Sequence, residues 1–130
     1  MKSRIHEEGV VTAFVVGLLM TFIVCAGLSV DGGRLIAARL TLADHAENAA
    51  RFAAQELVSL RTGSPKIDQQ AARHSAVQYL SDNKLIGEVA VNVESVTVTV
   101  SQTVEMSLLR LFGARDHLIS VTRRVEPRSE

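Results

Sequence analysis

The sequence predicts an α+β protein: a long N-terminal helix that is half membrane span and half stalk, followed by a small head with a second helix and a three-stranded antiparallel sheet. Three observations predict this fold. Residues 9–30 are apolar and carry no charge, residues 35–60 repeat apolar side chains every three or four positions, and residues 88–100 and 119–125 alternate apolar with polar side chains. With 130 residues, the chain has room for one small domain besides the helix.

The composition excludes several classes of protein. Fourteen basic residues balance fourteen acidic ones and only 4% of the residues are aromatic. A nucleic-acid binder normally carries a basic excess and often stacking aromatic side chains, so nucleic acid is not an expected partner. The single cysteine, Cys25, excludes an internal disulfide.

The first element is the apolar run from Gly9 to Val30, which follows a short N-terminal segment of residues 1–8. At 1.5 Å per residue it extends about 33 Å, enough for the hydrocarbon core of a bilayer. Its three hydroxyl residues, Thr12, Thr21 and Ser29, are expected to bond back to the helix backbone. The run therefore predicts a transmembrane helix, and the lipid bilayer is the first expected partner.

A cleaved secretory signal is the alternative interpretation. Cleavage after Val24-Cys25-Ala26 would release a soluble binding module that starts near Gly27. Against it, the apolar run is longer than a usual signal, and residues 1–8 carry as many acids as bases. A lipoprotein signal fails because Val24 occupies the position where a small residue should precede Cys25.

The basic residues beside the span give a weak indication of its orientation. Lys2 and Arg4 precede it, and Arg34 and Arg39 follow it. With the amino terminus, the first group slightly favours a cytoplasmic N-terminus. We therefore expect residues 31–130 outside the cytoplasm of a single-pass inner-membrane protein.

The second element is a stalk helix over residues 31–61. It opens with Asp31-Gly32-Gly33-Arg34, in which Asp31 and Arg34 share a helix face and the glycines favour a kink. An ion pair is expected between Glu47 and Arg51. The apolar stripe is rich in alanine, which favours close packing against the chain's own head or a partner subunit, and comprises Leu35, Ala38, Leu42, Ala46, Ala49, Ala53, Leu57 and Leu60.

The head is predicted over residues 62–126, before a polar tail at residues 127–130. Asp68 should cap a helix near residues 68–81. The core side of this helix is expected to hold Ile67, Ala71, Val77 and Leu80. Because so small a head buries little surface, we expect it to depend on the stalk for part of its core.

The strands of the head are predicted from alternating valines. Val89, Val91 and Val93 form one apolar face, and the alternation resumes out of phase at Val96, which predicts a turn or bulge near residues 92–95. A last strand contains Ile119, Val121 and Val125. Between them, Ser107 should cap a short helical turn at Leu108–Phe112 that Gly113 ends and that fills one end of the head.

The sequence offers no catalytic, cofactor-binding or metal site. The four histidines are scattered without metal-ligand spacing, and Ser, His and Asp form no nucleophile motif. Gly32-Gly33 lacks the setting of a phosphate loop. The polar face Thr97–Thr99–Ser101 is expected to face solvent or, alternatively, to dock a partner strand. We therefore expect neither an enzyme nor a small-molecule substrate.

Two small residues of the span, Ala13 and Gly17, are four positions apart, a spacing that lets a second membrane helix approach closely. They are the expected helix-packing residues.

The first half of the chain resembles TadE/TadG-like proteins of the Flp (Tad) pilus assembly system. The shared features are the glycine before an apolar helix (Gly9), the element Asp31-Gly32-Gly33-Arg34, and the alanine-rich stretch Ala43-Asp44-His45-Ala46. The C-terminal half is also similar to the family's strand, Leu-rich turn with glycine, and final strand.

The resemblance implies a pilin-like fold and a bitopic minor pilin, pseudopilin or assembly anchor whose helix contacts other pilus subunits. It also implies Gly9 as a possible leader-processing glycine and a possible location in surface pili. Processed members carry glutamate five residues after that glycine, where this chain has Phe14, whereas TadG-like members often lack it.

Overall fold

The computed structural model describes residues 4–58 and 66–127. It contains a long N-terminal helix, a second helix and a three-stranded antiparallel sheet, so the predicted α+β class is confirmed. The chain divides into two compact units. The first, here called the anchor unit, comprises residues 1–34 and 105–116; the second, the sheet unit, comprises residues 35–104 and 117–130.

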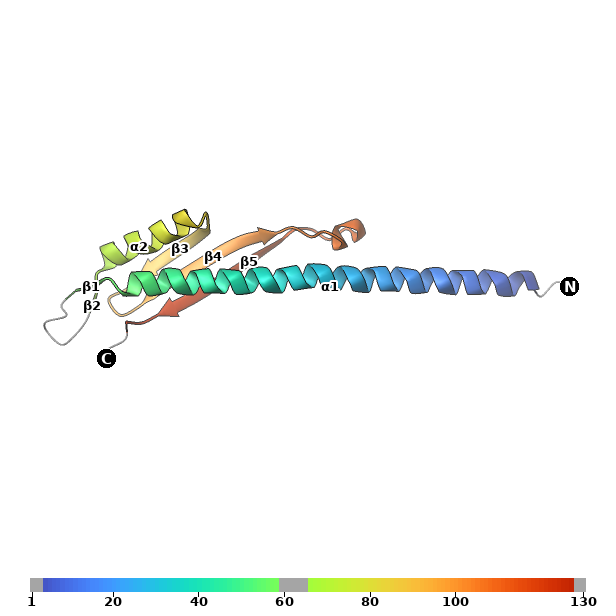
Figure 1. Ribbon diagram of the computed structural model, residues 1–130, viewed down its shortest axis with the longest axis horizontal. Coiled ribbons are helices and arrows are strands. Elements are labelled where there is room, and N and C mark those ends of the chain that lie inside the picture. Colours follow the sequence, from blue (N-terminus) through green and yellow to red (C-terminus); the bar gives the residue numbers. More distant parts are fainter. Residues whose placement is uncertain (1–3, 59–65, 128–130) are drawn as a thin grey trace. The chain divides into compact units, whose positions relative to one another are not determined.

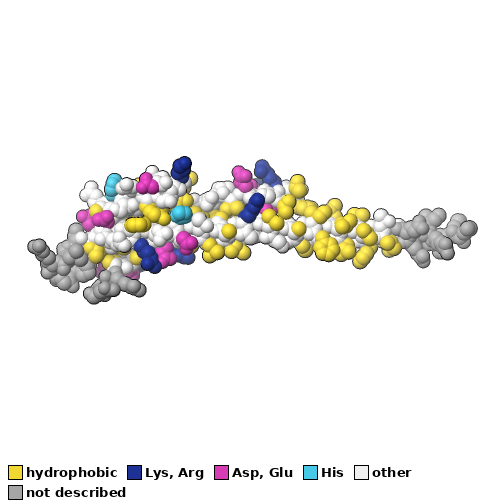
Figure 2. Space-filling model, viewed as in Figure 1, with side chains coloured by type: hydrophobic (Ala, Val, Ile, Leu, Met, Phe, Trp, Pro, Cys, Tyr) yellow, Lys and Arg dark blue, Asp and Glu magenta, His cyan; other side chains and the backbone are white. Residues whose placement is uncertain are grey.

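Helix α1, Arg4–Ala54, contributes to both units, and its N-terminal part carries the apolar run. Most residues of this run are exposed, among them Phe14 at 70% and Phe22 at 65%, whereas Val24 is half-buried and Gly27 is buried. Figure 2 shows them as a hydrophobic covering of the helix. Among the described residues, one helix, α1, is long and apolar enough to cross a membrane. Its most apolar stretch of 18 residues has a mean hydropathy of 2.5, and none of that stretch is buried. As predicted, the hydroxyls of Thr21 and Ser29 donate to the carbonyls four residues earlier, each over 2.9 Å.

The bounds of α1 correct two predictions. Helical backbone continues through Gly32 and Gly33, so the helix is not interrupted there. It ends at Ala54 rather than at residue 61, because Leu57–Val58 (β1) pairs antiparallel with Lys66–Ile67 (β2). The amide of Asp68 also donates to the carbonyl of Glu56 over 2.8 Å. Tertiary hydrogen bonds thus replace the helical ones, and Leu60 lies outside the described residues.

The three-stranded sheet has the order β3-β4-β5, formed by Ile86–Val91, Val96–Val104 and His117–Val125 (Figure 1). Val91 pairs with Val96, and the amide of Asn92 donates to the carbonyl of Ser95 over 2.8 Å. The predicted turn at residues 92–95 is therefore confirmed, and it explains the change of phase between the valines. Val93 lies in this turn and is 45% exposed, so its predicted place on the strand is wrong.

Helix α2, Gln69–Asp82, is capped as predicted by Asp68, whose carboxylate accepts from the amides of Gln70 and Ala71. Its buried face is rotated by about one residue from the predicted one. Ala72, Ala76 and Leu80 are buried, whereas Val77 is 51% exposed. The helix packs with a small-residue face, so a short alanine is buried and the bulkier valine remains outside.

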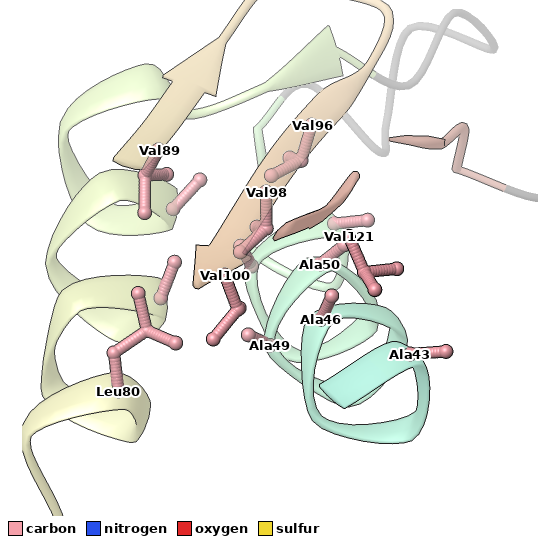
Figure 3. Packing of buried hydrophobic residues seen from close by; sticks show 14 of the residues in the cluster. Ala43, Ala46, Ala49, Ala50, Leu80, Val89, Val96, Val98, Val100 and Val121 are labelled. Atoms are coloured by element: carbon pink, nitrogen blue, oxygen red, sulfur yellow. The ribbon is translucent and has the colours of Figure 1, made fainter. Parts of the chain in front are cut away.

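The core of the sheet unit lies between one face of the sheet and the two helices. In Figure 3, Ala46, Ala49 and Ala50 of α1 lie beside the valines of β4, with Leu80 of α2 and Val89 of β3 on the other side. The buried cluster also contains Leu42 and Ala53 of the predicted stripe, together with Ala43, Ala50 and Ala54, which the prediction did not include. The middle of the stripe, from Leu42 to Ala53, therefore packs against the chain's own head, one of the two alternatives that its composition left open, whereas Leu35 and Ala38 are half-buried outside this cluster.

The polar face of β4 corrects another expectation. Thr97, Thr99 and Ser101 are half-buried, and β4 is the central strand, paired on both sides. These residues cannot form a strand-docking edge, because both neighbouring positions are already occupied. The hydroxyl of Thr99 instead bonds to that of Thr122 on β5 over 2.9 Å.

Candidate functional site

The most specific polar arrangement in the anchor unit centres on Asp31. Its side chain is only 1% exposed, and its two carboxylate oxygens accept from the backbone amides of Ser107, over 3.1 Å, and Leu109, over 2.7 Å. Leu109–Phe112 forms a short 3-10 helix, η2. Because the first amides of a helix have no partner within it, a carboxylate from α1 supplies the missing acceptors.

This arrangement corrects the predicted role of Ser107. No side chain near the start of η2 caps it locally; Asp31 does so from α1. The Ser107 hydroxyl instead accepts a hydrogen bond from the guanidinium of Arg34. The predicted end of the turn is confirmed, because Gly113 has a φ of 87°, a conformation that favours glycine.

The amides of the turn also determine the charge state of Asp31. The hydrogen bond from the Leu109 amide lowers the pKa of this carboxyl below its ordinary value, with further contributions from the amides of Ser107 and Leu108 and from the positive charge of Arg34. Burial opposes this by raising the pKa. The net direction is downward, so Asp31 is a carboxylate at neutral pH, and Arg34 lies near it without forming an ion pair.

Gly27 is the second point at which the turn meets the helix. It is buried, and a β-carbon built there would lie 3.3 Å from Leu109 Cδ2 and 3.4 Å from Leu108 Cβ. The turn is grouped with the anchor unit and has no buried residue between Leu109 and Phe112. The turn therefore packs against α1 at Gly27 and Asp31, a contact that the sequence analysis did not predict.

The other predicted site residues lie apart from this arrangement. A β-carbon at Gly32 or Gly33 would have no neighbour within 4 Å, so in this chain the glycines serve no close contact. Ala13 and Gly17 are exposed on the helix surface, and Gly9 lies within the helical backbone. Of the motif at residues 31–34, only Asp31 and Arg34 reach the turn.

The remaining polar groups of the described residues form separate, small clusters. Within the described residues, no three His, Cys, Asp or Glu side chains gather in a way that could hold a metal ion. A hollow of about 560 Å³ in the sheet unit is lined by the ends of α1 and β5. Its charged side chains include the pairs Glu47–Arg51 and Arg124–Glu126, the first of which was predicted. His45 bonds through Nδ1 to the Tyr79 hydroxyl over 3.2 Å and so links α1 to α2.

Sequence reasoning identified Asp31 and Arg34 but missed what they bind. The available signal was an acidic residue at the end of an apolar run, which needs hydrogen-bond donors if it is buried. Nothing in the sequence relates Asp31 to the amides of Ser107 and Leu109, which lie 76 and 78 positions away. Searches against protein-family models, curated proteins and solved structures found no match to the chain.

Proposed function

We propose that the chain is a non-enzymatic single-pass membrane protein that acts by assembly, as a minor pilin-like subunit or an assembly anchor of an Flp (Tad) type pilus. The observation that carries the membrane part is the exposed apolar run of α1. In its most apolar stretch of 18 residues, no residue is buried by the rest of the chain. Such a surface is stable in a bilayer or against other apolar helices but not in water.

The pilus part of the proposal depends on the resemblance to TadE/TadG-like proteins, whose Asp-x-Gly-Arg element corresponds to residues 31–34. In this chain the two charged residues of that element hold the turn at 107–109. In this proposal the N-terminus is cytoplasmic, and the sheet unit lies outside the inner membrane. The span would contact other subunits, and the sheet unit would set spacing or start assembly.

The proposed subunit contact is through Ala13 and Gly17. Both are exposed, and a β-carbon at Gly17 would meet nothing within 4 Å, so leucine fits at these positions in the isolated chain. Leucine at both positions should therefore leave the chain's own fold unchanged but block the approach of a neighbouring helix. We expect this to reduce membrane crosslinks and pilus number. Val15→Leu, two positions on and nearly opposite around the helix, is the matched control. Unchanged crosslinks and pilus number in the double variant would contradict the contact.

The experiment that tests the whole proposal is an intact-mass measurement on C-terminally tagged protein from sheared surface filaments and from membranes. A form in filaments that begins at Val10 indicates a processed minor pilin. Full-length chain confined to membranes indicates an assembly anchor. A soluble form cut near Ala26 would show a secreted binding module and would overturn the proposal.

A further inference from the structure

We propose that the turn Leu108–Phe112 is a second membrane contact, which inserts Leu111 and Phe112 into the edge of the bilayer beside the span. This inference rests on the membrane anchoring proposed above and adds a site to it. The partner is the lipid surface itself.

The depth of the turn follows from its contact with Gly27. Leu108 and Leu109 lie against this glycine, which belongs to the apolar run and precedes its end at Val30 by three residues, or about 4.5 Å of helix. The next contact, at Asp31, lies just beyond the run. All these residues belong to the anchor unit. When the run spans a bilayer, the turn is therefore held where hydrocarbon gives way to headgroups.

The outward side of the turn is apolar. Leu111 is 80% exposed, Phe112 is 49% exposed and Leu108 is 38% exposed. In water these side chains would be an unexplained exposed patch on a short segment, but at this depth they contact acyl chains. The carboxylate of Asp31 does not oppose insertion, because the amides of Ser107 and Leu109 satisfy it.

The charges around the turn decide which force drives the contact. Arg34, Arg110 and Arg115 are balanced by Asp31, Glu105 and Asp116, so these residues have no net charge. Arg110 and Arg115 are exposed, and at this depth such side chains extend to the headgroups. Insertion should therefore be driven by apolar contact and should occur on neutral phosphatidylcholine without anionic lipid.

The test uses the full chain with Cys25→Ala and one new cysteine that carries an environment-sensitive fluorophore, reconstituted in phosphatidylcholine vesicles. The probe positions are Leu111→Cys and Phe112→Cys in the turn. Met20→Cys, in the middle of the span and 55% exposed, is the bilayer control; Val93→Cys, in the turn of the sheet unit and 45% exposed, is the aqueous control. Quenching is measured with lipids that carry a nitroxide near the headgroup or near the end of the acyl chain.

We expect the labels at positions 111 and 112 to be blue-shifted and quenched several-fold more than the label at 93, most strongly by the nitroxide near the headgroup. A water-like spectrum at 111 and 112 with a buried label at 20 would overturn the turn contact and leave the membrane anchor intact. A water-like spectrum at 20 as well would contradict the anchor itself. A blue shift at 111 that weakens as the chain is diluted into excess lipid would show that another copy covers the turn, which also overturns the inference.

Discussion

At the scale of single residues, Asp31 is the side chain on which the anchor unit depends most. It joins α1 to a turn far along the sequence through two hydrogen bonds from backbone amides to a charged group. Bonds of this kind are stronger than those between neutral groups. Asp31 therefore has a different role from Asp44, which is an exposed residue of the same helix.

Asp31→Asn should loosen the turn, because the amide side chain has one acceptor oxygen in place of two. Hydrogen exchange at the amides of Ser107 and Leu109 should become several-fold faster in the full chain in detergent. Asp44→Asn is the matched control and should leave both amides unchanged. Equal protection in Asp31→Asn and the natural chain would show that the turn is held by its leucine contacts alone.

Acidification should release the same turn. Folding lowers the pKa of Asp31 below 3.8, the ordinary value of an aspartate. The contribution of Asp31 to the stability of the folded turn is therefore fully present above pH 3.8 and is lost as the pH falls through the lower pKa of the folded chain. Exchange at Ser107 and Leu109, corrected for the intrinsic effect of pH, should therefore rise only in strongly acidic solution. Asp31→Asn should abolish this dependence, and a dependence that persists in the variant would assign it to another group.

Gly87 is a residue whose lack of a side chain decides strand pairing. A β-carbon there would lie 2.6 Å from the carbonyl oxygen of Thr99 and 3.1 Å from Leu80 Cδ1. We expect Gly87→Ala to lower the free energy of unfolding by about 1–3 kcal/mol, as overpacking does. Urea unfolding followed by the fluorescence of Tyr79, the only tyrosine in a chain without tryptophan, measures this. Glu88→Ala, at the exposed neighbouring position, should change the value by less than about 0.5 kcal/mol.

At the scale of elements, α1 changes its chemistry along its length. Its N-terminal part exposes large apolar side chains such as Phe14 and Phe22, whereas its C-terminal part buries alanines against the sheet. Alanine contributes little apolar area per residue, but it lets the helix approach the valines of β4 closely. The packing thus depends on small volume rather than on large buried side chains.

Ala49→Leu should consequently destabilise the sheet unit. Ala49 is 0% exposed, and the added volume has no space among Val98, Val100 and Ala46. The expected loss in the free energy of unfolding is about 1–3 kcal/mol. Ala37→Leu, at an exposed position of the same helix, should cost less than about 0.5 kcal/mol. If the two variants unfold alike under urea, α1 does not pack against the sheet as described.

At the scale of the whole molecule, the head is not independent of the N-terminal helix. Among the residues that the structure describes, seven of the sixteen in the buried cluster come from α1: Leu42, Ala43, Ala46, Ala49, Ala50, Ala53 and Ala54. Without these α1 residues, the part of the sheet face that they cover would be exposed to water. Helix and sheet of the sheet unit should therefore fold as one cooperative body.

A truncated chain that starts at residue 64 should fail to fold cooperatively, because it lacks the α1 part of this core. A chain that starts at Leu35 retains that part and should show a cooperative thermal transition by circular dichroism. Cooperative unfolding of the shorter chain would contradict the shared core. The longer chain is the matched control, since both lack the apolar run.

The sequence predicted most elements because local patterns determine them. The alternation of valines and its change of phase located β3, the turn and β4, and Asp68 located the start of α2. The end of α1 was missed because the pairing of Leu57 with Ile67 overrides local helix propensity. The buried face of α2 was shifted by about one residue, because the helix turns Ala72, Ala76 and Leu80 toward the core and leaves Val77 outside.

By itself, the sequence determined the fold class, the apolar run and the alanine-rich stripe, and it singled out Asp31 and Arg34, since each follows from residue type and spacing. Only the tertiary structure decided what these features contact. It packed the stripe against the chain's own sheet, placed β4 in the centre, and brought the amides of Ser107 and Leu109 to Asp31. A buried carboxylate needs donors, but which amides supply them depends on how the chain folds back, and no local pattern records that.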